Sequence, residues 1–91
     1  MYRIVLACTG MPPDEGLPGA QCIKEEFTHR PWHTNVKCEW NGTQLVLQAD
    51  NDYDLKGLAL IDEFSDAISA CISNAEYGSI EVLSVTVLPY K

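Results

Sequence analysis

Two short segments of this chain carry most of the side chains that could do chemistry. His29-Arg30-Pro31-Trp32-His33 precedes one alternating run of residues, and Asp50-Asn51-Asp52-Tyr53-Asp54 follows the next. If the two runs pair as a hairpin with a two-residue turn, His33 lies opposite Asp50, with Cβ atoms about 5 Å apart. A carboxylate at that distance raises the pKa of an imidazole or helps it bind a cation. The simpler interpretation is an ordinary ion pair between two loops.

Cys8 is the candidate for a nucleophile, because it ends a predicted strand and opens a glycine-containing loop. A catalytic thiolate needs nearby positive charge or a helix N-terminus. The following loop supplies Asp14 and Glu15 instead, and it contains no arginine. Cys8 also continues the apolar alternation of Ile4 and Leu6, so the simpler interpretation is a core residue.

Metal ligation has candidates in His29, His33 and Asp50, with Cys22 as a further zinc ligand to consider. A structural zinc site needs four ligands, and the usual paired-cysteine spacing is missing. Calcium is excluded for the acidic turn, because Leu55 stands where a calcium loop requires glycine and Ile61 where it requires glutamate. We therefore expect no metal and no cofactor.

The four cysteines do not form a recognisable motif. They stand at Cys8, Cys22, Cys38 and Cys71, and no two have CxxC spacing. Most fall on predicted core faces, where a free cysteine behaves as a small hydrophobic residue. We expect reduced thiols and a cytoplasmic protein. No run approaches the roughly 18 apolar residues that span a bilayer.

Composition restricts the class of partner. The 91 residues suit one domain, residues 1–91, with a single core, and 13 acids against 6 bases give a net charge of −7. Nucleic-acid backbones repel such a surface, so we expect no direct binding of DNA or RNA. A basic protein surface would be attracted instead. The alternative is that the acidic balance only keeps the protein soluble.

The clearest structural pattern lies between Val36 and Ala49. Two alternating runs flank Asn41-Gly42, a pair typical of two-residue hairpin turns because it tolerates positive φ twice. The pattern predicts a pairing of Cys38 with Leu45, and a one-residue slip would expose the apolar face. That face is Val36, Cys38, Trp40, Leu45 and Leu47.

Around this hairpin the chain predicts a strand at 2–8, a loop at 9–18, a helix over 20–27, a helix over about 54–75 and a strand at 79–88. An aspartate at 52 or 54 can cap the second helix. The order β-α-β-β-α-β indicates an α+β, ferredoxin-like sandwich, with a four-stranded antiparallel sheet, two helices on one face and the usual strand order 4-1-3-2. In this plan the two segments at 29–33 and 50–54 meet at one end of the sheet.

The sheet face away from the helices is expected to show Val5, Ala7, Val46 and Val82 among polar residues. It lacks the aromatic residues on which RNA-binding domains of this plan stack bases. A partly apolar open face can mark an interface, so a homodimer through this face is a further prediction.

These observations favour a small acidic protein-binding domain, a regulator, inhibitor or neutralising partner of a more basic protein. Charge complementarity would speed association, and a few aromatic residues would supply affinity. The alternative class is an enzyme or metal-dependent protein built on His33 and Asp50, or on Cys8. The predicted partner-binding residues are Trp32, His33, Asp50, Asp52, Tyr53, Asp54, Asp62, Glu63 and Asp66.

Overall fold

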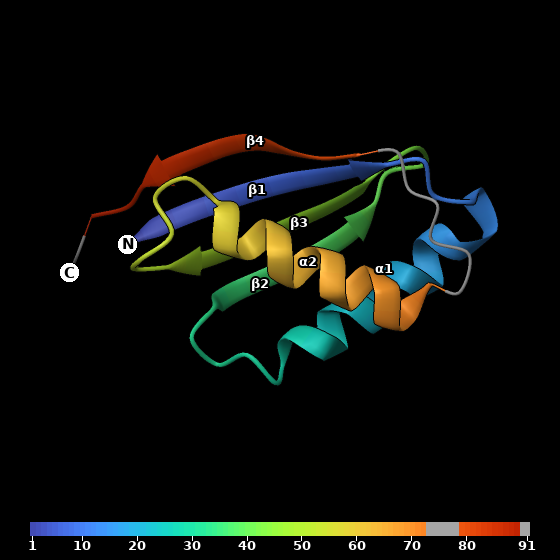
Figure 1. Ribbon diagram of the computed structural model, residues 1–91, viewed down its shortest axis with the longest axis horizontal. Helices are drawn as coiled ribbons and strands as arrows, with labels where there is room; N and C mark the ends of the chain where they lie inside the picture. Colours follow the sequence, from blue (N-terminus) through green and yellow to red (C-terminus); the bar gives the residue numbers. More distant parts are fainter. Residues whose placement is uncertain (73–78, 90–91) are drawn as a thin grey trace.

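The computed structural model describes residues 1–72 and 79–89, which form a four-stranded antiparallel sheet and two helices (Figure 1). The sheet order is β2-β3-β1-β4, and every neighbouring pair is antiparallel. The α+β class is therefore confirmed. The elements in chain order are β1 (Tyr2–Thr9), α1 (Pro13–Phe27), β2 (Thr34–Trp40), β3 (Leu45–Asn51), α2 (Leu58–Cys71) and β4 (Ser79–Val87).

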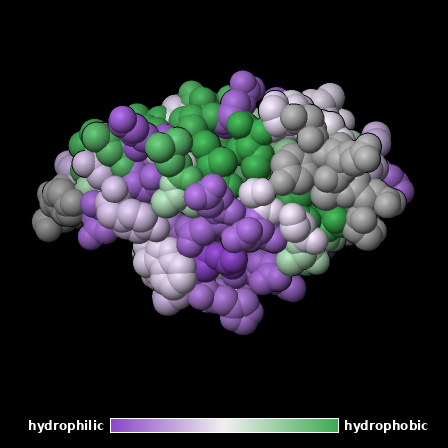
Figure 2. All heavy atoms as spheres, viewed as in Figure 1, coloured by the Kyte–Doolittle hydropathy of each residue, from purple (hydrophilic) through white to green (hydrophobic). Residues whose placement is uncertain are grey.

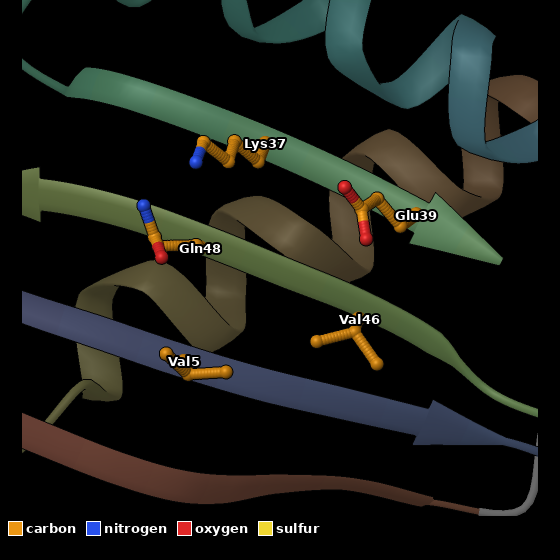
Figure 3. A pocket seen from close by; sticks show the side chains of 5 residues that line it. All are labelled: Val5, Lys37, Glu39, Val46 and Gln48. Carbon is orange, nitrogen blue, oxygen red and sulfur yellow. The ribbon is translucent and has the colours of Figure 1, made fainter. Parts of the chain in front are cut away.

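The core lies between the two helices and one face of the sheet. Figure 3 looks at the opposite face, where α2 passes behind the strands. Alternate residues of the central strands β1 and β3 are fully buried against the helices, as the period of two along a strand requires. The helices contribute Ala20, Ile23, Phe27, Leu60, Phe64, Ala67 and Ile68.

The predicted loop at 9–18 is wrong, because α1 begins at Pro13 and includes Pro18. Pro13 is tolerated because it stands in the first helical turn, where the backbone N–H has no helical acceptor. Pro18 lies in the second turn, where a proline removes one helical hydrogen bond. The glycines of this segment also have a packing role. Gly16 lies directly under the indole of Trp40, and Gly19 lies against Ile72, so α1 approaches the sheet and α2 closely.

The second helix is shorter than predicted at its start. Residues 52–57 form turns, and α2 begins after Gly57, which has a left-handed φ of 75°. The expected aspartate cap is Asp54, whose carboxylate accepts from the backbone N–H groups of Ala59 and Leu60 at 3.2 and 2.9 Å. The predicted end of this helix, including Ala75 and Tyr77-Gly78, lies outside the described residues.

The hairpin exists, but its predicted turn and register are wrong. Trp40 pairs with Leu45 and Cys38 with Leu47, so the loop has four residues and the register is displaced by two. Only Gly42 in this loop has positive φ, while the Asn41 side chain accepts from the backbone N–H groups of Thr43 and Gln44. A displacement of two keeps every side chain on its predicted face.

A bulge in the last strand changes which residues face the helices. The pairing of β4 with β1 shifts between Val5 and Leu6, so that Leu83 is the extra residue. As a result Val82 lies opposite the core residue Leu6. Its side chain lies close to Gly57, since a Cβ atom at Gly57 would be 3.3 Å from it. The prediction that Val82 belongs to the open face is therefore wrong.

A disulfide joins the two helices through Cys22 and Cys71, which are 49 residues apart in the chain. The expectation of four reduced thiols is therefore wrong for this pair. Cys8 and Cys38 are free and buried. Sequence spacing could not reveal the bond, because it depends on how α1 and α2 pack. No helix in the described ranges is long and apolar enough to cross a membrane.

Candidate partner-binding surface

The segments at 29–33 and 50–54 do meet, because His33 contacts both Asn51 and Tyr53. In Figure 1 the 50–54 turn lies near the start of β1, and the 29–33 connection runs below it. His33 lies between them with its side chain fully buried. Its Nδ1 is 3.3 Å from Asn51 Nδ2, and its Nε2 makes a short contact with Glu63 on α2. His33 therefore links the connection before β2 to both β3 and α2.

The surrounding hydrogen bonds indicate which nitrogen of the His33 ring carries the proton. Asn51 Oδ1 accepts from the backbone N–H groups of Tyr53 and Asp54, at 3.2 and 2.9 Å, so its amide nitrogen must point to His33. An amide nitrogen only donates, which makes Nδ1 of His33 an acceptor. The proton then lies on Nε2 and is donated to Glu63. The contact is then a hydrogen bond that the imidazole donates to the carboxylate.

Glu63 is the centre of a wider set of contacts. Trp32 Nε1 donates to its Oε1 at 3.1 Å, and Arg30 Nε lies 3.8 Å from the same oxygen. Arg30 is itself held over the Phe27 ring and donates to the carbonyl of Glu26. The carboxylate is therefore fixed by groups that all come from the connection between α1 and β2.

Two exposed aromatic rings flank the buried histidine. The ring centroids of Trp32 and Tyr53 lie 6.0 and 6.2 Å from that of His33. Both side chains remain about half exposed, 52% for Trp32 and 51% for Tyr53, although the His33 ring between them is buried. Rigid, half-exposed aromatic residues are typical of protein-binding surfaces.

The field around these rings is negative. Partial burial, followed by the charges of Glu63, Asp54 and Asp52, raises the pKa of the Tyr53 hydroxyl, with Trp32 acting in the opposite direction. Along the outer side of α2, Asp62 and Asp66 are also exposed. We call Trp32, Tyr53, Asp52, Asp62, Glu63 and Asp66 the acidic aromatic surface. Figure 2 shows hydrophilic side chains gathered over this side of α2 and the connection that follows α1.

The expected contact between His33 and Asp50 is wrong. Thr34 lies opposite Asp50, and the strand irregularity between Thr34 and Lys37 turns His33 toward Asn51. Asp50 is buried and bound by Arg3, whose Nε and Nη2 donate at 3.0 and 2.9 Å. Asn35, which has a left-handed φ of 50°, adds a third hydrogen bond of 2.9 Å.

Asp50 and Asp54 therefore have internal roles. Burial favours a raised pKa for Asp50, but the hydrogen bonds from Arg3 and Asn35 and the charge of Arg3 outweigh it and lower the pKa. Asp54 is buried beneath the start of α2. Of the predicted partner-binding residues, Asp50, Asp54 and His33 are inaccessible to a partner, whereas the other six are the acidic aromatic surface.

The thiol candidate lies inside the protein. Cys8 is fully buried, and its Sγ is 3.7 Å from the carbonyl of Thr9. Burial raises the pKa of the Cys8 thiol to about 11, and burial together with Glu39 raises that of Cys38 to about 12. A raised pKa disfavours the thiolate that nucleophilic catalysis requires.

The metal-ligand candidates do not converge. His29 is exposed after the end of α1, His33 bonds to Glu63 and Asn51, and Asp50 bonds to Arg3. Cys22 is held in the disulfide. Within residues 1–72 and 79–89, no three histidine, cysteine or acidic side chains form a cluster that could hold a metal ion.

The open face of the sheet carries a shallow hollow of about 240 Å³, lined by Val5, Lys37, Glu39, Val46 and Gln48 (Figure 3). Val5 and Val46 are half-buried at its floor, and the charged side chains lie along β2.

Arg3, Asn35 and Asn51 were not singled out in the sequence. Arg3 could have been found only from the pairing of β1 with β3, which sets it directly opposite Asp50. Comparison with known proteins adds no candidate: no family model, curated protein or solved structure matches the chain significantly.

Proposed function

We propose that this protein is a small acidic binding domain that acts by contact with a more basic protein, as its regulator, inhibitor or neutralising partner. The observation that carries the proposal is the acidic aromatic surface, where Trp32 and Tyr53 are half exposed beside a fixed carboxylate. Aromatic residues held in place bind without a large loss of side-chain entropy.

The electrostatic part of the mechanism follows from the placement of the acids. Asp62 and Asp66 are exposed on α2, one on each side of Glu63 in sequence, and Asp52 is exposed beside Tyr53. Lysine and arginine side chains of a partner would approach this surface along a favourable field. Their ammonium or guanidinium groups could also stack on Trp32 or Tyr53. Association is then expected to weaken as salt increases.

The fold assignment belongs to the same proposal. We propose that the domain is ferredoxin-like, supported by the β-α-β-β-α-β order and by the strand order, which is 4-1-3-2 when followed from the β4 edge. The cytoplasmic location stays a prediction. Persistent disulfides are typical of oxidising compartments, so Cys22–Cys71 weighs against it.

Affinity capture with matched variants tests the binding proposal. The protein is immobilised, exposed to extract of its source cells at low and high salt, and compared with Trp32→Ala/Tyr53→Ala and Asp62→Asn/Asp66→Asn. Leu17→Ala is the control, because Leu17 is equally exposed but lies on α1. Basic proteins should bind the wild type and the control at low salt and be lost from both double variants. Equal retention by all four proteins would contradict the proposal.

A further inference from the structure

The two edges of the sheet differ in how they are protected. At one edge, β2 carries the irregularity between Thr34 and Lys37 and the charged residues Lys37 and Glu39. Charged side chains on an edge strand hinder the pairing of another strand. β4, at the other edge, also carries a bulge, at Leu83, but it has nine residues and a single charge, Glu81. Among the described residues, no strand pairs with its outer row of backbone groups.

An apolar surface adjoins the β4 edge. Val82, Leu83 and Val87 of β4 are exposed, as are Leu55 and Leu58 at the start of α2. The largest exposed fractions are 69% for Val87 and 61% for Leu58. In Figure 2, hydrophobic side chains gather over β4, β1 and the beginning of α2. We call these five residues the β4 apolar surface.

We propose that β4 pairs antiparallel with β4 of a second copy of this chain, extending the sheet across a twofold axis. A twofold interface requires a surface complementary to itself, and an antiparallel edge strand meets this requirement. This inference concerns the β4 edge and not the acidic aromatic surface, so it goes beyond the proposed binding function.

The pairing register follows from the bulge. Ile80, Val82, Val85 and Val87 lie opposite Cys8, Leu6, Ile4 and Tyr2, so all four face the helices. Directly opposed residues of antiparallel strands share a face. Placing Val82 opposite Val85 of the second copy also places Ile80 opposite its Val87. Apolar residues then match on the helix side, and the two Leu83 residues lie near the axis.

The net charge of −7 does not oppose this arrangement strongly. In this register Glu81 lies opposite Thr86 of the second copy, which carries no charge. The two Glu81 residues are separated by five positions, about 16 Å at roughly 3.3 Å per residue. That separation exceeds the Debye length of about 8 Å at physiological salt. A strongly basic partner, by contrast, would find a single acid along β4.

The oligomeric state tests the proposal directly. Analytical ultracentrifugation of the wild type should give twice the 10.1 kDa of one chain as concentration rises. Leu83→Lys places two ammonium groups at the axis and should raise the dissociation constant tenfold or more, on the order expected for facing like charges. Leu17→Lys makes the same charge change on α1 and should dimerise like the wild type.

Cysteine cross-linking tests the register independently. Under mild oxidation Leu83→Cys should form a covalent dimer, whereas Val87→Cys, which lies far from the axis, should not. Circular dichroism checks that each variant is folded. A wild type that stays monomeric at about 1 mM, or a Leu83→Lys variant that dimerises like the control, would overturn the proposal.

Discussion

Arg3 holds Asp50 through two parallel hydrogen bonds, although 47 residues separate them in the chain. The pair joins β1 to β3, and the aspartate is buried while the arginine side chain remains 38% exposed. Arg3 binds both carboxylate oxygens, and Asn35 donates a further hydrogen bond to Oδ2. Arg3 thus binds the carboxylate that the sequence pattern predicted as the partner of His33.

Replacement of this arginine should make stability depend on pH in a defined way. In Arg3→Met the burial of Asp50 is no longer offset, so the variant should melt several degrees lower at pH 7. The pKa of Asp50 is lowered in the native fold, so the stabilisation exists above the pKa of the unfolded chain and is lost as pH falls through the folded pKa. The melting temperatures of the wild type and of Arg3→Met should therefore draw closer as the pH falls below about 4. The double variant Arg3→Met/Asp50→Asn should melt with a weaker dependence on pH than Arg3→Met, and an equal dependence would contradict this account.

Removal of the Glu63 carboxylate should destabilise the end of the molecule where His33 lies. In Glu63→Ala the buried Nε2–H of His33 loses its acceptor, and an unsatisfied buried donor costs about 1–3 kcal/mol. Glu63→Gln keeps an acceptor oxygen and should cost less. Urea denaturation measures both, and tryptophan fluorescence reports whether Trp32 has moved. Equal losses in the two variants would show that the hydrogen bond is unimportant.

A methyl group at Gly16 should separate α1 from the sheet. A Cβ there would overlap the indole ring of Trp40. Overpacking costs about 1–3 kcal/mol, against a gain of about 1 kcal/mol when alanine replaces glycine in a helix. We expect Gly16→Ala to be less stable than the wild type in urea denaturation. Addition of Trp40→Leu should recover part of the loss, and a Gly16→Ala protein more stable than the wild type would refute the packing role.

Reduction of the Cys22–Cys71 bond should lower stability substantially. The bond closes a loop of 49 residues, for which restriction of the unfolded chain corresponds to about 4 kcal/mol. Denaturation of Cys22→Ser/Cys71→Ser, compared with the wild type with and without reductant, measures this difference. Mass spectrometry of the unreduced protein should show it lighter by two hydrogen atoms.

The two buried thiols provide the control for that experiment. Cys8 and Cys38 have pKa values raised to about 11 and about 12, so both should react slowly with a thiol reagent at pH 8 in the native state. Rapid labelling of four thiols without denaturant or reductant would mean that the disulfide is absent.

Much of the fold could be predicted from local patterns. The alternation in Val36–Ala49 and the spacing of Leu60, Phe64 and Ile68 correctly indicated which faces are buried. The start of α1 could not be predicted in this way. Pro13 suits the first position of a helix, but Pro18 disfavours a helix in isolation. The packing of Gly16 against Trp40 and of Gly19 against Ile72 gives a tertiary reason for the helix to include Pro18.

The sequence by itself determined the order of the elements, the faces of the strands and the acidic character of the exposed side of α2. The tertiary structure alone decided the hairpin register, because a displacement of two residues leaves every side chain on the same face. It also decided the partners of His33 and Asp50. Asn51, Glu63 and Arg3 reach them across long stretches of chain, and contacts of this kind depend on how the elements pack.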